Sequence, residues 1–296
     1  MKPNENLSML KEPLMRTPWS RRKFMSVAGA SLALSSRGVW GAESPHADNL
    51  DPLALGLQSY TLREFDVAKA IDLAKELGFA HIEFTRKHIS ADTPVETVEA
   101  VKRKMASLGL RISAQGVNPL TNDHAANRKV FELAKRMGNR NVTADPTEDS
   151  FDSVDKLVAE YNLRVAIHNH GPGARYDKIA DVLKAIQGHD PRIGACADLG
   201  HYIRSAEDPI KAIMLFGDRL CGIHLKDFAE QTKNAKGVIL GKGHLDLVGV
   251  YKALKKVNFP ADGALSLEYE ENAKNPLPDV KECVAVAHEA RAKALE

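Results

Sequence analysis

Four short apolar segments in the second half of the chain each end in a side chain that can bind a metal ion. The segments are VAIHNHGPG (165–173), IGACADLGHY (193–202), LCGIHLKDF (220–228) and ALSLEYE (264–270). Each is typical of a buried strand that stops at a polar residue. The residues at those ends are His168, Asp198, His224 and Glu268. A fold that brought the four strand ends together would form one site for a divalent cation.

The alternation of side chains along a strand supports the same site. His168 and His170 share one face of their segment, and His224 and Lys226 share one face of theirs. The large aliphatic residues, together with Cys221, fall on the opposite faces, where they would pack against helices. Carboxylates and imidazoles that point into a core are costly to bury without a partner, and a cation is such a partner. One such His is also compatible with an ordinary core histidine, so the metal prediction depends on the four residues jointly.

The ligand set combines nitrogen and oxygen atoms and contains no thiolate. It suits Mn, Co, Fe, Zn or Mg and does not choose among these metals. Cys196 lies two residues before Asp198 on the same predicted face, and we expect it to be a packed thiol. The chain has three cysteines without CxxC spacing, which predicts buried thiols and no disulfide framework.

A repeated strand–helix unit would position these residues. Apolar runs alternate with amphipathic segments, and several of the helical segments end in Gly before the next strand. Eight such units in about 250 residues predict an α/β fold, the (β/α)₈ barrel, whose strands end at one common face. No nucleotide-binding glycine motif follows a strand. Strands are expected to begin near Leu53, Ala80, Leu110, Arg140, Leu163, Arg192, Leu220 and Gly263, and helices to lie near 66–77, 94–108, 123–137, 151–161, 176–187, 207–216, 246–257 and 277–294.

The first 42 residues carry the pattern of an export signal. SRRKFM (20–25) is a twin-arginine motif, the apolar stretch SVAGASLAL (26–34) follows it, and VWGA (39–42) offers a cleavage site. The stretch is too short to span a bilayer. We therefore expect residues 43–296 to be the barrel domain of a periplasmic or otherwise exported protein, carried by the twin-arginine translocase. A disordered basic N-terminus is the alternative.

The motifs resemble the xylose isomerase-like TIM barrels, the group often called sugar phosphate isomerases/epimerases. The resemblance begins at LGLQSYTLR (55–63), continues through GFAHIEF (78–84), and is most specific in HNHG, DLGHY, HLKD and SLEYE. It implies a small-molecule sugar substrate and allows a homodimer. It also implies that His201 and Lys226 face the substrate, and that one divalent metal is held by His168, Asp198, His224 and Glu268.

The chemistry that this group shares is removal of a proton beside a carbonyl, with the metal acting as a Lewis acid. Our candidates for the base are Glu268 or Glu270, then His170 and His201, although Glu270 is also compatible with an exposed loop carboxylate. Lys226 would polarise an oxygen or anchor a hydroxyl, unless it only pairs with the acidic ligands. The long loop 228–245 would shape the substrate site, and Asp246 would cap the following helix. Further substrate contacts are predicted for Tyr60, Glu83, Gln115 and His244.

One departure from the family pattern bears on the reaction. Ketose 3-epimerases of this group have Glu where this chain has His168, and they use two metal-bound glutamates as bases on opposite faces of the sugar. A metal-bound His is a poor base, so only Glu268 remains of that pair. A His at this position is also similar to members that dehydrate or cleave keto-sugars, such as inosose dehydratases and 3-keto-glycoside-processing enzymes.

The leading interpretation is a metal-dependent isomerase or epimerase that acts on a free sugar, because an exported enzyme meets few sugar phosphates and no phosphate-binding glycine loop follows the last two strands. The alternatives are a metal-dependent lyase, hydrolase or dehydratase on keto-sugars or 3-keto-glycosides, and a non-catalytic sugar-binding barrel. The net charge of +2 gives no indication of a nucleic-acid surface. A relationship to the AP endonucleases, which share the barrel, is disfavoured because those proteins carry a multi-zinc ligand set and a basic groove.

Overall fold

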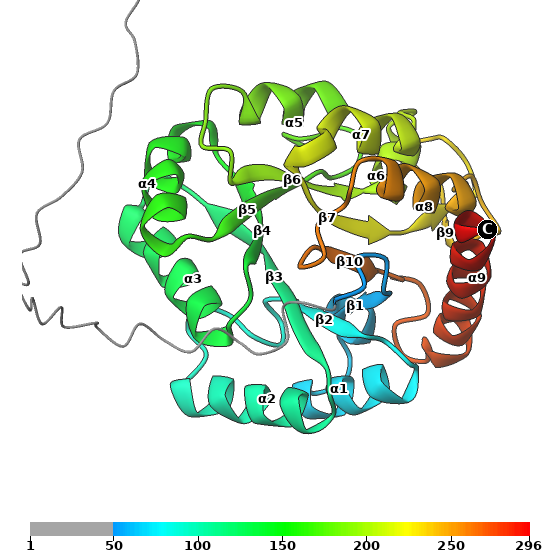
Figure 1. Ribbon diagram of the computed structural model, residues 1–296, viewed down its shortest axis with the longest axis horizontal. Coiled ribbons are helices and arrows are strands. Elements are labelled where there is room, and N and C mark those ends of the chain that lie inside the picture. Colours follow the sequence, from blue (N-terminus) through cyan, green and yellow to red (C-terminus); the bar gives the residue numbers. More distant parts are fainter. Residues whose placement is uncertain (1–49) are drawn as a thin grey trace, which may run out of the picture. The chain divides into compact units, whose positions relative to one another are not determined.

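The computed structural model describes residues 50–296, which form a closed barrel of parallel strands surrounded by helices (Figure 1). The order around the barrel is β1-β10-β7-β6-β5-β4-β3-β2, and every neighbouring pair is parallel. The predicted (β/α)₈ barrel is therefore confirmed, whereas the predicted export signal lies outside the described residues. The barrel strands are β1 (Gly56–Gln58), β2 (His81–Phe84), β3 (Arg111–Leu120), β4 (Asn141–Pro146), β5 (Arg164–His168), β6 (Ile193–Asp198), β7 (Leu220–Leu225) and β10 (Ala264–Leu267).

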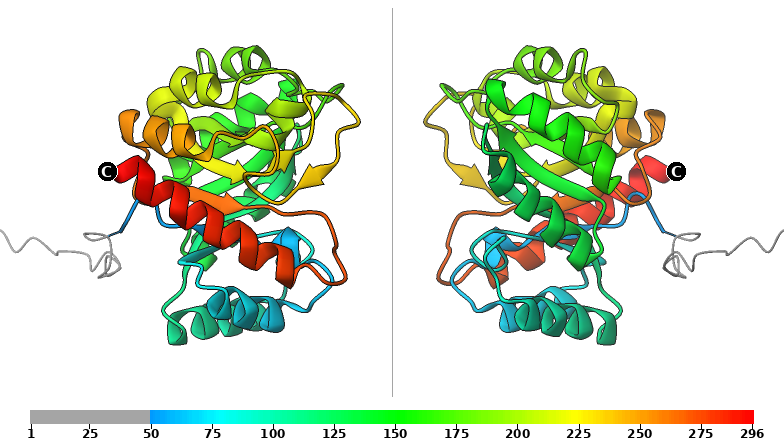
Figure 2. Two further views of the ribbon diagram at one scale, coloured as in Figure 1. Left: turned by 90° about the vertical axis from the view of Figure 1, so that its right-hand side faces the viewer. Right: turned by 90° about the vertical axis from the view of Figure 1, so that its left-hand side faces the viewer.

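The helices lie where the periodicity places them, on the outside of the barrel (Figures 1 and 2). One helix was not predicted, the short α6, which follows β6 directly. The helices are α1 (Val67–Glu76), α2 (Val95–Ser107), α3 (His124–Met137), α4 (Phe151–Tyr161), α5 (Ile179–Ile186), α6 (Leu199–Arg204), α7 (Pro209–Phe216), α8 (Leu247–Lys256) and α9 (Leu277–Leu295).

Several helices begin at an aspartate, which explains why their starts could be predicted. The carboxylates of Asp66, Asp123, Asp208 and Asp246 accept backbone N–H groups in the first turns of α1, α3, α7 and α8. An N-cap of this kind satisfies donors that have no partner inside the helix. The predicted capping role of Asp246 is thus confirmed. At its other end α3 stops at Gly138, whose φ of 82° is the left-handed conformation that glycine adopts without strain.

Aliphatic side chains of the strands pack against the helices in one continuous core. Ile223 and Leu225 of β7 belong to that core, as the alternation predicts. Cys221 does not, and here the prediction was wrong. The β6–β7 register shifts between Ala195 and Cys196, and Cys221 instead groups with Ala166 and Cys196.

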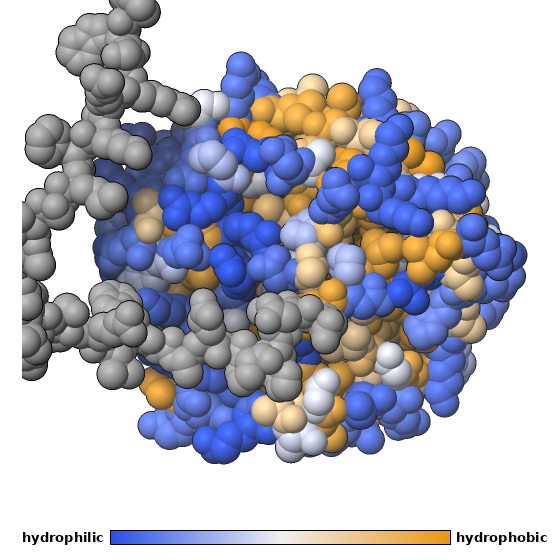
Figure 3. All heavy atoms as spheres, viewed as in Figure 1, coloured by the Kyte–Doolittle hydropathy of each residue, from blue (hydrophilic) through white to orange (hydrophobic). Residues whose placement is uncertain are grey.

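The segment after β7 contains a hairpin that was not predicted, formed by β8 (Asp227–Phe228) and β9 (Gly237–Val238). Figure 2 shows this hairpin on the same side of the barrel as the loop after β10, which is the side where the barrel strands end. The surface in Figure 3 mixes hydrophilic and hydrophobic residues, with hydrophilic ones spread around its edge. Within residues 50–296, no helix combines the length and the apolar character needed to cross a membrane.

Candidate metal centre

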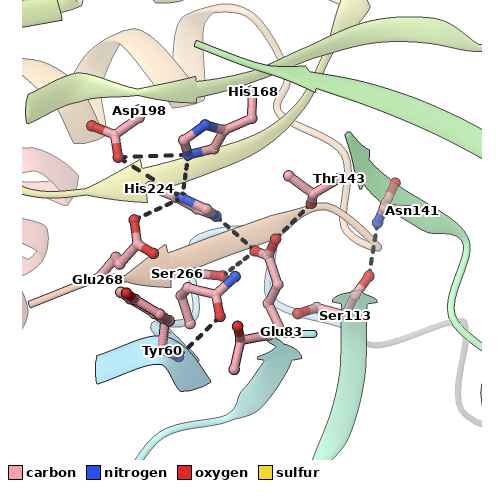
Figure 4. A network of polar contacts seen from close by, with 12 residues as sticks. Tyr60, Glu83, Ser113, Asn141, Thr143, His168, Asp198, His224, Ser266 and Glu268 are labelled. Carbon is pink, nitrogen blue, oxygen red and sulfur yellow. Dashed lines mark hydrogen bonds and ion pairs between the residues drawn. The ribbon is translucent and has the colours of Figure 1, made fainter. Parts of the chain in front are cut away.

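The four predicted ligands converge at the C-terminal end of the barrel, and all four are buried. One nitrogen or carboxylate oxygen from each lies within 4.8 Å of the others. Nδ1 of His224 is 3.0 Å from Nε2 of His168 and 3.2 Å from Oε2 of Glu268. Oδ2 of Asp198 lies 3.7 Å from Nε2 of His168 and 3.9 Å from Nδ1 of His224. Ligand atoms about 2.1 Å from one ion are roughly 3 to 3.5 Å apart, so the four atoms in Figure 4 are close to ligand spacing.

The register of the strands produces this convergence. His224 lies opposite Asp198 in the β6–β7 ladder, and His168 lies opposite Cys196, two residues before Asp198. Glu268 follows the last residue of β10, and its N–H donates to the carbonyl of Leu225, which holds it beside the end of β7.

The two carboxylate oxygens of Asp198 have different partners. Oδ1 accepts the N–H of His201 at 2.7 Å and caps α6. Oδ2 is buried, and its nearest donor is the ammonium of Lys226 at 3.1 Å. Asn169 holds the backbone of Asp198 from both sides, because its side-chain oxygen accepts the N–H and its amide donates to the carbonyl. Asn169 was not predicted, and its place between two histidines in HNHG is the one feature that could have indicated it. A buried carboxylate oxygen that lies beside two imidazole nitrogens is a suitable ligand for a cation.

Lys226 lies against the same carboxylates. Its Nζ is 2.7 Å from Oε2 of Glu268, 3.1 Å from Oδ2 of Asp198 and 3.2 Å from Oε1 of Glu270. Its stem packs on Gly200 at the start of α6, where a Cβ would come within 2.7 Å of the Lys226 Cγ atom. The glycine of DLGHY is therefore a requirement of this close packing.

The buried charged groups of the centre carry a net negative charge, which would favour a divalent cation. The three buried carboxylates of Glu83, Asp198 and Glu268 carry −3, and the buried Lys226 carries +1. Burial would lower the pKa of His224, but the neighbouring carboxylates of Glu83 and Glu268 raise it well above its usual value, so His224 adds a second positive charge and the net charge without a metal is −1. Burial alone would raise the pKa of Glu268, but Lys226 and His224 hold it well below its usual range. Burial would likewise lower the pKa of Lys226, and Asp198, Glu268 and Glu270 raise it well above its usual value. All three carboxylates and the ammonium thus stay charged at neutral pH.

His170 and His201 lie beside the four ligands as neutral imidazoles. Burial, aided by His168, lowers the pKa of His170 to about 4. Burial lowers the pKa of His201 to about 3, although Asp198 opposes the shift. Their ring centroids are 5.8 Å apart, and that of His170 is 4.6 Å from His168. The predicted companions of the metal site are therefore in place, as groups that can donate or accept hydrogen bonds without carrying charge.

A second, deeper group of metal-type side chains comprises Glu83, Cys196 and His224. Both oxygens of Glu83 already accept hydrogen bonds, from Thr143, Ser266 and His224. Burial raises the pKa of the Cys196 thiol to about 11, so it stays protonated at neutral pH. Because the carboxylate oxygens of Glu83 already accept hydrogen bonds and the thiol of Cys196 is protonated, this group is a poor metal site. The burial of Cys196 agrees with the expectation that it is a packed thiol.

A cavity of about 330 Å³ adjoins the metal centre. Lys226, Glu268 and Glu270 line it on the barrel side, and the loop after β7 contributes Phe228 together with residues 233–235 and 237–238. Arg204 at the end of α6 donates two hydrogen bonds to the carbonyl of Lys233 and so ties this loop to the barrel. The loop thus borders a space of the size that a monosaccharide requires.

The predicted substrate contacts have different surroundings. Tyr60 is half-buried on the 3-10 helix Ser59–Leu62, which follows β1. Gln115 is fully buried, and its amide is engaged by Ile89 and Asn118. Glu83 is fully buried beneath His224 (Figure 4). His244 is exposed and is not among the residues that line the cavity. Their contacts with a substrate stay predictions.

Residues 71–287 match the xylose isomerase-like TIM barrel family. A 3-oxo-isoapionate decarboxylase from Pectobacterium atrosepticum is 24% identical over 185 residues, which are 56% of this chain and 64% of that protein. An inosose dehydratase from Clostridium tetani is 28% identical over 145 residues, 43% of this chain and 47% of that protein. The chain thus spans from about half to just under two thirds of these relatives. The 3-keto-D-glucoside 4-epimerase of E. coli has the same fold, with a TM-score of 0.64 at 16% identity over 80% of this chain and 99% of that one.

Proposed function

Because the chain belongs to the xylose isomerase-like TIM barrel family, we propose that it is a divalent-metal-dependent enzyme that removes a proton beside the carbonyl of a free sugar. The observation that carries this proposal is the convergence of His168, Asp198, His224 and Glu268 beside a cavity at the end of the barrel. A barrel that only bound sugars would gain nothing from burying this ligand set.

The residues present fit a divalent ion by their donor set, by the convergence of one buried ligand atom from each, and by the net negative charge around them. Nε2 of His168, Oδ2 of Asp198, Nδ1 of His224 and Oε2 of Glu268 would hold it. An ion bound there would supply Lewis-acid polarisation of a carbonyl oxygen.

The side chains around the ligands suggest how the proton moves. Glu268 would be engaged in metal binding, whereas Glu270 has 37% of its side chain exposed and borders the cavity. We therefore assign the base to Glu270, whose carboxylate would take the proton from the carbon beside the carbonyl. Lys226 remains an ammonium and would stabilise negative charge that develops on a substrate oxygen. His170 and His201 would hydrogen-bond sugar hydroxyls.

A single base restricts the outcome. Glu270 can return the proton to the neighbouring carbon on the same face while the hydroxyl proton on that carbon moves to the former carbonyl oxygen, which interconverts an aldose and a ketose. Epimerisation needs delivery from the opposite face, which His170 or His201 would have to provide. Isomerisation is therefore our leading proposal for this chain.

Elimination is the second candidate. In that reaction Glu270 would pass the abstracted proton to the hydroxyl group on the next carbon, which leaves as water. Two features favour it: the curated relatives include an inosose dehydratase and a decarboxylase, and His168 stands where the two-base ketose epimerases have Glu. A hydrolase acting on 3-keto-glycosides would use the same first step. The glycosidic alcohol on the next carbon would leave with the abstracted proton, and water would then add to the double bond.

Metal content tests the site first. Mass spectrometry of the purified protein should find about one divalent metal per chain, and Asp198→Ala and His224→Ala should lose it. Asp145→Ala is the matched control, because Asp145 lies at the same barrel end and pairs with Arg175 instead of the ligands. A wild type that stays metal-free after incubation with Mn, Co and Zn would contradict the proposal.

The reaction is tested in deuterium oxide with a panel of free and 3-keto sugars. Proton abstraction incorporates deuterium beside the carbonyl, which nuclear magnetic resonance detects, and the product distinguishes isomerisation from loss of water. Glu270→Gln should slow the exchange by about 10²- to 10⁴-fold while metal content is unchanged. Glu271→Gln is the control, because its carboxylate borders the same cavity without contacting Lys226. Sugar binding without any exchange would support the non-catalytic barrel.

Export, the free sugar and the homodimer remain proposals that depend on the sequence. Replacing Arg21 and Arg22 with Lys should leave the protein in the cytoplasm of a bacterium that has the twin-arginine translocase, whereas the wild type should reach the periplasm. Light scattering of the purified protein measures the oligomeric state. A sugar phosphate turned over in preference to its free sugar would refute the substrate assignment.

A further inference from the structure

The imidazole of His224 faces a different partner with each of its two nitrogens (Figure 4). Nδ1 points to the ligand group, 3.0 Å from His168 and 3.2 Å from Glu268. Nε2 points to the opposite side and lies 3.0 Å from Oε2 of Glu83. The ring is fully buried, so water cannot replace either partner.

Glu83 is itself held in place by strands on two other sides of the barrel. Thr143 of β4 donates a hydrogen bond to Oε1, and Ser266 of β10 donates one to Oε2 at 3.0 Å. The side chain has no exposed surface. An ionised carboxylate accepts hydrogen bonds and cannot donate them. The partner nitrogen of His224 must therefore carry a hydrogen, so Nδ1 is the nitrogen whose lone pair would be available to a metal.

We propose that Glu83 is a positioning residue that fixes His224 in the Nε2–H tautomer and thereby directs its Nδ1 lone pair at the metal. This inference rests on the metal site of the proposed function. It assigns Glu83 a role in the protein interior in place of the predicted contact with a sugar hydroxyl. Carboxylates that accept the free N–H of a ligating imidazole orient the ring and make it a stronger ligand.

The other imidazole ligand lacks such support. Nδ1 of His168 is buried and has no hydrogen-bond partner among the described residues. The orientation of the histidine pair therefore depends on His224, and through it on Glu83. Glu83 comes from β2, far along the chain from the strands that supply the ligands, so it couples the first half of the barrel to the metal centre.

Glu83→Gln tests this role with little change in shape. If the Gln amide presents its oxygen to Nε2, the tautomer is kept but the negative charge is lost. If it presents its NH₂ group, His224 must accept on Nε2, and Nδ1 becomes protonated and unable to bind. Both orientations weaken the ligand. We expect a 10- to 100-fold loss of Zn²⁺ and Co²⁺ affinity, measured by competition with a chromophoric chelator, and a changed visible spectrum of the Co²⁺ form.

Ser113→Ala is the matched control for loss of a buried polar contact inside the barrel. The Ser113 hydroxyl pairs with His81 at 2.9 Å and does not contact Glu83. The metal affinity of the Ser113→Ala variant should equal that of the wild type. Equal affinity of Glu83→Gln and the wild type would overturn the inference and leave the metal site intact, whereas a wild type that binds no metal would overturn both proposals.

A measurement on the wild type keeps the inference testable if Glu83→Gln does not fold. In the zinc-loaded protein with ¹⁵N-labelled histidine, long-range ¹H–¹⁵N correlation should show the His224 Nε2 nitrogen protonated and the Nδ1 nitrogen bound to metal. The reverse pattern would overturn the inference.

Discussion

One buried carboxylate holds the loop that borders the cavity, and its replacement by an amide should release that loop. Asp227 directly follows Lys226 and is 1% exposed. Its two oxygens together accept four backbone N–H groups, at distances between 2.8 and 3.0 Å. Oδ1 accepts from Phe228 and Leu245, and Oδ2 accepts from Gly241 and Gly243. The carboxylate thereby joins the beginning and the end of the segment 228–245.

The magnitude of the effect follows from these contacts. In Asp227→Asn the amide keeps one acceptor oxygen, and its NH₂ group must face two N–H donors. Hydrogen bonds to charged groups contribute about 1.5–3 kcal/mol each, so the loss of two would cost about 3–6 kcal/mol. Gly241 and Gly243 are exposed, and water can replace their acceptor. The Asn should therefore turn its NH₂ group towards them, and we expect the lower value, about 3 kcal/mol.

Amide hydrogen exchange measured by mass spectrometry tests this prediction. A loop that opens with about 3 kcal/mol less free energy exchanges roughly 100-fold faster. The acceleration should be confined to peptides within 229–245. Asp246→Asn is the control, because it makes the same substitution at the end of the same loop, where Asn is an equally good N-cap. If the loop of Asp227→Asn exchanged as slowly as that of Asp246→Asn, the carboxylate would not anchor it.

Three further outcomes can be checked on the purified protein. Gly243→Ala should destabilise the same loop, because a Cβ would come within 2.3 Å of a backbone carbonyl oxygen, and hydrogen exchange of the loop reports it. Burial, aided by Arg111, lowers the pKa of His81 from 6.5 to about 3. The unfolded chain then binds a proton below pH 6.5 that the folded protein excludes, so His81 alone should lower the free energy of unfolding by about 1.2 kcal/mol between pH 7 and pH 5.5. In denaturant titrations the fall for His81→Gln should be smaller than that of the wild type by this amount. Burial also raises the pKa of each thiol to about 11, so iodoacetamide should label the native protein far more slowly than the unfolded chain at Cys196, Cys221 and Cys283; equal labelling rates would contradict their burial.

Local signals in the sequence were sufficient to predict the fold and the convergence of the four candidate ligands. Several helices begin at aspartates and end near glycines, and both features depend only on neighbouring residues. The ligands were recognisable because each interrupts an apolar run at its end. The hairpin of β8 and β9 was missed, since strands of two residues leave no periodic pattern. The short helix α6 was missed because its first turn coincides with the ligand motif DLGHY.

The residues that support the ligands could not be found in the same way. Asn169, Thr143 and Ser266 are small polar residues of types that are common on strands and loops, and their partners lie far away in the sequence. Glu83 and His224 are 141 positions apart. Such contacts exist only after the barrel has closed, so neither spacing nor alternation predicts them.

Glu83 shows that a single sequence does not indicate how high along the barrel axis a side chain lies. Alternation correctly places it inside the barrel, and its position near the end of β2 suggested the substrate face. The height of a side chain along the barrel axis cannot be predicted in this way, because the strands of a closed barrel tilt and are staggered. The register pairs His224 with Ser266, Ser266 with Gly56, and Gly56 with His81, yet Glu83, two residues beyond His81, is the side chain that reaches His224. Residues that are paired by the hydrogen-bonded register around the barrel therefore lie at different heights along the barrel axis. Glu83 contacts the Nε2 side of His224, whereas the other candidate ligands lie on its Nδ1 side. Because of this stagger, a residue predicted to contact the substrate instead contacts a candidate metal ligand from below.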